Sequence, residues 1–141
     1  MLKLIRKIAA EAIPLDNLTL TYDTRTKSRL LAKTDGGIEV GLSLPRGTVL
    51  HDGDLLASED GQVILIKAAP EPVSVARTND PCLFAKACYH LGNRHVPLAI
   101  QPGELMYLLD HVLDQLVEHL GLTVEHQMLP FDPEPGAYHA H

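Results

Sequence analysis

Histidines at two places in the chain are the residues whose chemistry stands out. The segment Leu91-Gly92-Asn93-Arg94-His95 sets one histidine beside an asparagine, an arginine and a glycine, just ahead of Val96-Pro97-Leu98. The last residues include His139-Ala140-His141, and a His-x-His pair has little structural reason to stand in such a tail. Imidazoles are common ligands of transition metals. We therefore expect both places to contribute to one metal site.

The number of ligands makes this prediction more specific. A lone histidine near an apolar segment is more often structural than a ligand, and a transition metal needs roughly four to six ligands. A two-fold dimer would supply two copies of His95, and symmetric dimers are the commonest oligomers. His139 and His141 could complete the shell, because residues i and i+2 of an extended chain point the same way. The predicted site is therefore His95, His139 and His141 in a homodimer.

Asp110 and His111 are weaker candidates for metal binding. They stand at a predicted helix start, where His111 is most simply a surface residue, but a second, minor metal position stays open. We assign no function to His119 and expect His126, in an alternating strand, to face outward. The carboxylates of the second half occupy positions typical of exposed residues. Motifs of hydrolases and of phosphate-binding loops are absent, so an enzyme is not the leading hypothesis.

The charge of the chain is unevenly placed. Residues 1–70 hold nine Lys/Arg and nine Asp/Glu, whereas residues 71–141 hold three and nine, so the whole net charge of −6 lies in the second half. Seven of the eight histidines lie there too. An acidic region rich in imidazoles repels phosphate backbones and attracts cations. This argues against nucleic acid as a partner and favours a divalent metal.

The first half has the pattern of a small all-β domain, a barrel or a sandwich. Short apolar or alternating runs are separated by Asp35-Gly36-Gly37, Glu59-Asp60-Gly61 and other turn sequences, which supply the positive φ angles of tight hairpins. No window has helical length and period. The expected strands are Leu2 to Ile8, Leu18 to Tyr22, Arg29 to Thr34, Ile38 to Leu44, Leu55 to Ser58 and Val63 to Lys67. We expect this domain to span residues 1–70 and Ala68 to Pro72 to be a linker.

The second half predicts a β-α-β-β-α-β order, the ferredoxin-like unit. Asn79-Asp80-Pro81 starts a helix that Gly92 is placed to end, and Asp110 starts a second helix that Gly121 stops. The expected strands are Val73 to Ala76, Val96 to Gln101, Glu104 to Leu108 and Leu122 to Leu129. We place this domain at residues 71–135 and a mobile tail at residues 136–141. The predicted fold class is α+β.

Length, hydropathy and cysteine content limit the number of domains and the cellular compartment that we expect. The chain has 141 residues, 45% of them hydrophobic, enough for one ordinary domain or two small ones. No window approaches the 18 or so uncharged apolar residues of a membrane span. Cys82 and Cys88 on one helix would lie about 9 Å apart along its axis, too far for a disulfide. We expect two buried free thiols and a cytoplasmic protein.

Three segments of the second half carry a family resemblance. Cys88-Tyr89-His90-Leu91-Gly92-Asn93-Arg94-His95-Val96-Pro97-Leu98 is similar to the signature of the UreE family of urease accessory proteins. So are Tyr107-x-x-Asp110-His111-Val112-Leu113 and Pro130-Phe131-x-Pro133-Glu134-x-Gly136-Ala137-Tyr138. The first half resembles the β-rich N-terminal domain of that family in pattern only.

The resemblance implies a nickel metallochaperone that dimerises through its second, ferredoxin-like domain. His95 then matches the interface metal ligand, and His139 and His141 match the C-terminal histidines. The family delivers Ni²⁺ to apo-urease together with the urease GTPase, and also binds Zn²⁺ or Cu²⁺. This chain departs from longer-tailed members in its short histidine tail, and it has Leu108 and Leu109 where some members carry a histidine.

Three functions follow from the sequence. The leading one is a cytoplasmic nickel chaperone without enzymatic activity. The alternatives are a small metal-dependent hydrolase that uses the same histidines, and a protein-interaction module whose β domain binds a client and whose histidines are incidental.

Overall fold

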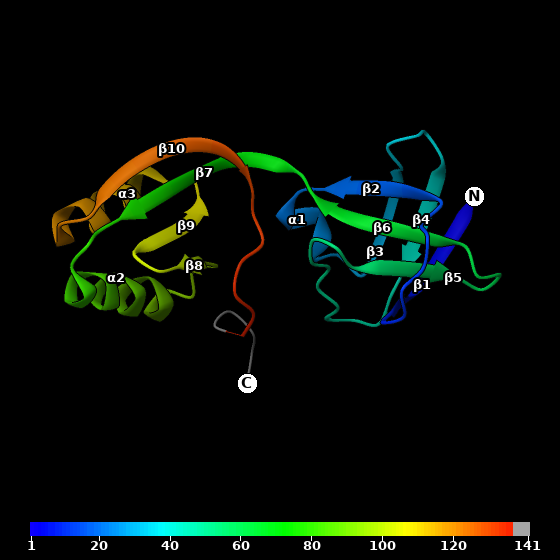
Figure 1. Cartoon of the computed structure of the whole chain (residues 1–141), viewed down its shortest axis with the longest axis horizontal. Helices are drawn as coiled ribbons and strands as arrows, with labels where there is room; N and C mark the ends of the chain where they lie inside the picture. Colours follow the sequence, from blue (N-terminus) through cyan, green and yellow to red (C-terminus); the bar gives the residue numbers. More distant parts are fainter. Residues whose placement is uncertain (137–141) are drawn as a thin grey trace. The chain divides into compact units, whose positions relative to one another are not determined.

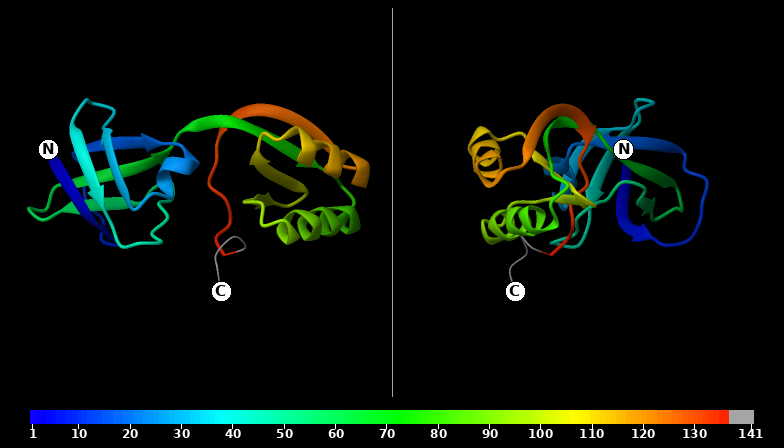
Figure 2. Two further views of the ribbon diagram at one scale, coloured as in Figure 1. Left: turned by 180° about the vertical axis from the view of Figure 1, so that it is seen from behind. Right: turned by 60° about the vertical axis from the view of Figure 1, so that its left-hand side comes forward.

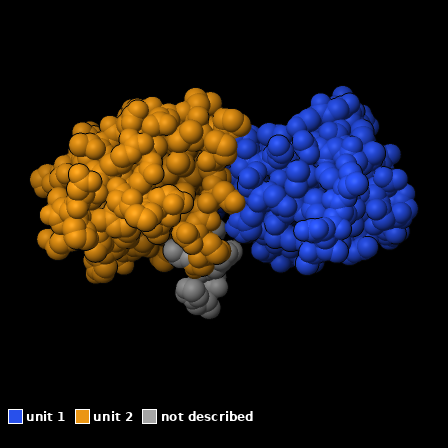
Figure 3. Space-filling model, viewed as in Figure 1, with its two compact units in different colours: residues 1–69 blue, residues 70–141 orange. Residues whose placement is uncertain are grey.

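The chain divides into two compact units. A computed structural model describes residues 1–136, and Figure 3 colours its two units, which comprise residues 1–69 and 70–141. The five remaining residues, with Tyr138, His139 and His141 among them, lie outside the described part. Each unit combines strands with at least one helix, so the fold is α+β (Figure 1).

Unit 1 is built around one sheet of six strands in the order β2-β6-β5-β1-β4-β3. The β1–β4 and β2–β6 pairs are parallel and the other pairs are antiparallel. The elements are β1 (Leu2–Ile8), β2 (Asp16–Leu20), α1 (Tyr22–Arg25), β3 (Arg29–Lys33), β4 (Glu39–Ser43), β5 (Leu55–Ser58) and β6 (Val63–Ala68).

The core of unit 1 comes from the alternate residues of these strands. Fully buried side chains include Leu4, Leu18, Leu56 and Ile64, each from a different strand. Asp16 of β2 contacts the turn that follows β3: its Oδ2 accepts hydrogen bonds from the Thr34 hydroxyl (2.6 Å) and the Gly36 N–H (2.9 Å). These bonds, with that of the Asn17 N–H, hold the pKa of Asp16 below its usual value.

Unit 2 has four strands and two helices in the order β-α-β-β-α-β, as predicted. Its sheet has the strand order β10-β7-β9-β8, with all neighbours antiparallel. The elements are β7 (Pro70–Arg77), α2 (Pro81–Asn93), β8 (Ala99–Gln101), β9 (Glu104–Leu108), α3 (His111–Leu120) and β10 (Thr123–Pro130).

Both helices of unit 2 pack on the same face of this sheet (Figure 2). Buried Ala87 and Leu91 of α2 and Val117 of α3 share a core with Leu105 and Tyr107 of β9. The helix starts are local: Asp80 accepts hydrogen bonds from the N–H groups of the two residues after Pro81 (2.8 and 3.2 Å). These contacts confirm the predicted N-cap. Proline suits the first helical position because an N–H at that position has no partner within the helix.

Several predicted boundaries are wrong. The proline-rich linker does not exist, because Pro70 and Pro72 lie in β7 and pair with β10. The strand predicted to reach Tyr22 ends at Leu20, and Tyr22 starts the short helix α1 in a half that was expected to lack helices. Of the extended segment from Val96 to Gln101, only the last three residues form a strand.

Two expectations about side chains are also wrong. Cys82 is exposed rather than buried, and Cys88 is partly buried; both thiols are free. Asp114, which was grouped with the exposed carboxylates, is only 5% exposed. Within residues 1–136, no helix is long and apolar enough to cross a membrane.

Candidate metal centre

His95 lies immediately beyond the C-terminus of α2 and controls how that helix ends. The helix runs to Asn93, one residue past the predicted Gly92 stop. The N–H of His95 donates to the carbonyl of Gly92 (3.0 Å), and the N–H of Val96 donates to the carbonyl of Leu91 (3.1 Å). This pair of bonds is the Schellman motif, in which the residue after the C-cap takes a left-handed conformation.

The left-handed residue is therefore the histidine itself. His95 has φ of 58° and, among residues 1–136, is the one non-glycine residue with positive φ. A Cβ makes this conformation unfavourable, and proteins normally place glycine there. The side chain of His95 is exposed. A backbone outlier of this kind is a marker of a functional residue when the surrounding structure holds it in place.

Helix α3 ends with the same motif and provides the comparison within one molecule. The N–H of Gly121 donates to Glu118 (3.0 Å) and the N–H of Leu122 donates to Val117 (3.0 Å). Gly121 has φ of 111° and occupies the position that His95 occupies in α2. Unit 2 thus uses glycine at one helix end and tolerates an imidazole at the other.

The apolar spacing around these helix ends is a sequence signal that the prediction of a Gly92 stop did not use. Leu91 and Val96 are five apart and pack in the same core, as do Val117 and Leu122. A contact between residues so spaced commonly accompanies the Schellman motif. Once their packing is known, the spacing of Leu91 and Val96 fits His95, and not the predicted Gly92, as the left-handed residue.

Asp110 and His111 lie where the sequence placed them, at the start of α3. The Asp110 carboxylate accepts hydrogen bonds from the N–H groups of Val112 (2.9 Å) and Leu113 (3.1 Å), so its Oδ1 caps the helix. The His111 side chain is 81% exposed, and its Nδ1 lies 4.0 Å from Oδ2 of Asp114.

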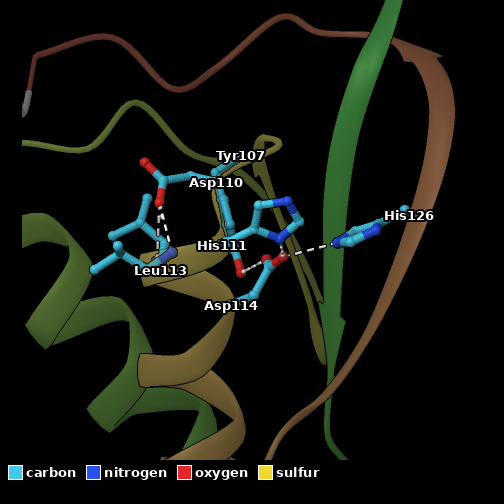
Figure 4. A network of polar contacts seen from close by, with 7 residues as sticks. Tyr107, Asp110, His111, Leu113, Asp114 and His126 are labelled. Atoms are coloured by element: carbon cyan, nitrogen blue, oxygen red, sulfur yellow. Dashed lines mark hydrogen bonds and ion pairs between the residues drawn. The ribbon is translucent and has the colours of Figure 1, made fainter.

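Asp114 is the centre of a polar network that sequence reasoning missed (Figure 4). Its Oδ1 accepts a hydrogen bond from the Tyr107 hydroxyl (2.7 Å), and its Oδ2 lies 2.7 Å from Nε2 of His126. The rings of His111 and His126 approach edge to face, with centroids 6.0 Å apart. The His126 side chain is 45% exposed, as expected of an outward-facing residue, but its contact with Asp114 of α3 was not predicted.

The environment of Asp114 favours its charged form. Burial by itself raises the pKa of this carboxyl, but Ser74, His126 and Tyr107 outweigh it and hold the pKa below its usual value. The buried Oγ of Ser74 has no partner within the full geometric limits of a hydrogen bond among residues 1–136. Burial, together with the adjacent carboxylate, raises the pKa of Tyr107, so its hydroxyl remains a donor.

The C-terminal segment returns to the connection that follows His95. Phe131 is fully buried, and the Glu134 N–H donates to the carbonyl of Leu98 (2.6 Å), three residues beyond His95. His139 and His141 lie outside the described residues. Within residues 1–136, no group of three potential ligands is arranged to hold a metal ion.

Comparison with known proteins decides the family. The model of the UreE N-terminal domain matches residues 1–69, and the model of the UreE C-terminal domain matches residues 71–141. The chain belongs to the UreE family of urease accessory proteins. The family resemblance inferred from the sequence is thereby confirmed.

Individual UreE proteins are similar over most of their length. The urease accessory protein UreE of Escherichia coli O157:H7 (strain EC4115 / EHEC) is 51% identical over 146 aligned residues, which cover 100% of this chain and 95% of that protein. UreE of Vibrio parahaemolyticus is 58% identical over 84% of this chain and 75% of its own length. UreE of Proteus mirabilis is 55% identical over 86% of this chain and 75% of its own length.

Proposed function

We propose that this chain is a nickel metallochaperone that binds Ni²⁺ and delivers it during assembly of the urease metallocentre, without catalysing a reaction itself. The observation that carries the proposal is His95, an exposed imidazole held in a left-handed conformation where α3 has glycine. Its backbone hydrogen bonds to the end of α2 fix its position. A ligand on such a support is oriented before the metal arrives.

One imidazole per chain is too few for nickel, so the site needs further ligands. We propose that a second copy of the chain supplies a second His95 and that His139 and His141 complete the shell. The anchored Glu134 supports this geometry. His139 is five positions after Glu134, a span of up to about 17 Å, whereas Leu98 is three positions after His95, a span of up to about 10 Å. The tail is therefore long enough to reach His95.

The remaining features of the proposal concern partners and setting. We assign unit 2 to the ferredoxin-like class, supported by its β-α-β-β-α-β order, and assign it both dimerisation and metal binding at residues 71–135. Residues 1–70, which comprise unit 1 and Pro70, are assigned to partner binding, and residues 136–141 to the supply of metal ligands. We place the protein in the cytoplasm, working with the urease accessory GTPase and apo-urease. Because affinity follows ligand type, Zn²⁺ or Cu²⁺ would bind the same histidines.

Asp110 and His111 remain a weaker, second position for an ion. Oδ1 of Asp110 already accepts hydrogen bonds from two helix N–H groups, and these donors would compete with a cation for that oxygen. A hydrolase would need an open coordination position with a general base beside it. The buried carboxylate of unit 2, Asp114, is instead bonded to Tyr107 and lies against His126.

The test is a melting series with and without Ni²⁺. Bound metal stabilises the folded protein by RT ln(1 + [Ni²⁺]/Kd), about 2.7 kcal/mol at a hundredfold excess over Kd. We expect His95→Ala to remove most of this shift and His119→Ala, at an exposed position of α3, to keep it. Light scattering should show a dimer for all three proteins. A full nickel shift in His95→Ala, or a monomeric wild type, would contradict the proposal.

A further inference from the structure

Unit 1 carries an exposed apolar surface. Its residues lie early in the chain, many positions before the proposed histidine ligands. We call it the Leu31 face; it comprises Met1, Lys3, Arg29, Leu31, Lys33 and Glu39. Leu31 is 75% exposed and Met1 is 69% exposed. Two shallow hollows, of about 520 and about 330 Å³, lie on this face, and Met1 and Leu31 line both of them. Exposed apolar side chains beside hollows mark interaction sites.

The centre of the face is shaped by Gly41. Strand register aligns Lys3 of β1, Gly41 of β4 and Leu31 of β3 in one row. A Cβ on Gly41 would lie 3.2 Å from Cε of Met1 and 3.6 Å from Cδ2 of Leu31. The missing side chain therefore leaves room for Met1 to lie across the sheet. A methionine is flexible and polarizable, so it can adapt to a ligand and alter the division between the hollows.

The rim of the face is basic in a protein that is acidic. Lys3, Arg29 and Lys33 are exposed on it with one carboxylate, Glu39, so the face carries a net charge of +2, whereas the chain carries −6. Such a surface attracts a partner that brings carboxylates around an apolar centre.

β3 also presents backbone groups for hydrogen bonding. It is the last strand of the sheet order, with β4 on one side (Figure 1). The Leu44 N–H donates to the Ser28 carbonyl, and the Thr34 N–H donates to the Ile38 carbonyl. In this register the even-numbered residues of β3 are the ones that hydrogen-bond to β4. The N–H and C=O groups of Arg29, Leu31 and Lys33 therefore point to the outer edge. An edge of this kind is a template for an added strand.

We propose that the Leu31 face binds an extended segment of a partner protein, which adds to the edge of β3 and alternates apolar and acidic side chains. The apolar side chains contact Met1 and Leu31, and the carboxylates meet Arg29, Lys33 and Lys3. A lipid surface could satisfy the charges and the apolar centre, but it has no row of N–H and C=O groups to pair with β3. This binding mode rests on the proposed role of unit 1 in partner binding, but not on the nickel site.

The test uses a fluorescent peptide of about eight residues, the length of one strand, that alternates valine and glutamate. Its counterparts alternate valine and lysine, or carry N-methyl groups on the amides that would face β3. Binding to the full chain is followed by fluorescence anisotropy, and contacts are located by NMR with ¹⁵N-labelled protein. The variants are Leu31→Asp, the double variant Arg29→Glu with Lys33→Glu, and the control Ile13→Asp, whose side chain is 95% exposed in the loop before β2.

We expect the acidic peptide to bind and to shift amide signals of β3, β4 and β1. Leu31→Asp should weaken binding by about tenfold or more, the double variant should reverse the preference toward the lysine peptide, and Ile13→Asp should bind like wild type. N-methylation should abolish binding. All variants should keep the nickel-induced melting shift, which separates failure here from failure of the proposed function.

Four results would overturn the proposal: no binding by the acidic peptide, equal binding of acidic and basic peptides, equal binding of the N-methylated peptide, or unchanged binding by Leu31→Asp. Binding to phosphatidylglycerol vesicles without binding to the peptide would identify the face as a lipid surface and would also overturn it.

Discussion

Replacing His95 by glycine separates the structural cost of this residue from its function. Its φ of 58° is a conformation that glycine adopts without strain, as Gly121 does at the end of α3. We therefore expect His95→Gly to make the metal-free protein more stable. Substitutions that raise stability at a functional position commonly cost the function, and here the same change removes the imidazole.

The expected gain follows from two opposing terms. The left-handed conformation costs a residue with a Cβ about 1–2 kcal/mol. A glycine loses more conformational freedom on folding, and this loss offsets about 0.4–1 kcal/mol of that stabilisation. The net gain is about 0.5–1 kcal/mol in the free energy of unfolding. For a unit of this size that corresponds to a rise in Tm of about 2–8 °C.

The assay is urea and thermal unfolding of the metal-free protein, with Gly121→Ala as the matched control at the equivalent position. That substitution adds a Cβ to a residue with φ of 111° and brings it within 3.0 Å of Cδ1 of Leu83. It should lower stability by about 1 kcal/mol or more. Opposite signs for the two substitutions would show that both positions obey the same backbone rule.

Two results would refute the reasoning. A loss of metal-free stability in His95→Gly would mean that side-chain contacts of His95 outweigh its backbone strain, so that the residue serves the fold. Retention of the Ni²⁺-induced rise in Tm by His95→Gly would mean that the strained imidazole is not the metal ligand.

Three further predictions concern the tail, the buried carboxylate and acidity. Deleting residues 138–141 should leave the Tm of the metal-free protein nearly unchanged and weaken Ni²⁺ binding in calorimetry, whereas Phe131→Ala, at a fully buried position, should cost about 3–5 kcal/mol; a large loss of metal-free stability on deletion would show that those residues serve the fold. Asp114→Ala should cost about 1–3 kcal/mol at pH 7 by leaving the buried Tyr107 hydroxyl without its acceptor. Because folding lowers the pKa of Asp114, its contribution is complete above the unfolded carboxyl pKa of about 3.9 and falls as pH drops through the lower folded pKa; a wild-type advantage in urea unfolding that grows below pH 4 would contradict this sign. Ni²⁺ affinity should fall on acidification through about pH 6, because histidine ligands must be neutral; calorimetric affinity that is unchanged at about pH 4.5 would exclude a histidine site.

The sequence alone determined the features that depend on neighbouring residues. The caps at Asp80 and Asp110 were predictable because a side-chain oxygen bonds an N–H two or three residues away. The bounds of β9 agree with the predicted run, since alternation over a few residues is enough to define a strand with one buried face.

Pairing partners far along the chain decided other boundaries. Pro70 and Pro72 suggested a linker, yet they belong to β7 because β10 pairs with them. Both lie beyond the part of β7 that pairs with β9, which begins at Val73. A proline without an N–H is tolerated at this end of the strand, where β9 has ended. The Pro72 carbonyl still accepts a hydrogen bond from the Leu109 N–H (3.2 Å). Local composition could not reveal that these prolines pair with Met128 and Pro130, close to the other end of the chain.

The site shows the same division. Residue types and spacing predicted His95 as a metal ligand, and they placed Asp110 and His111 at a helix start. Only the tertiary structure showed that His95 itself is the left-handed residue, because the packing of Val96 against the core around Leu91 decides where α2 ends. Likewise, Tyr107, Asp114 and His126 come from three elements, β9, α3 and β10, that the fold of unit 2 brings together. Helical periodicity places Asp114 on a turn of α3, but its burial depends on the strands beneath it, and no local pattern encodes that contact.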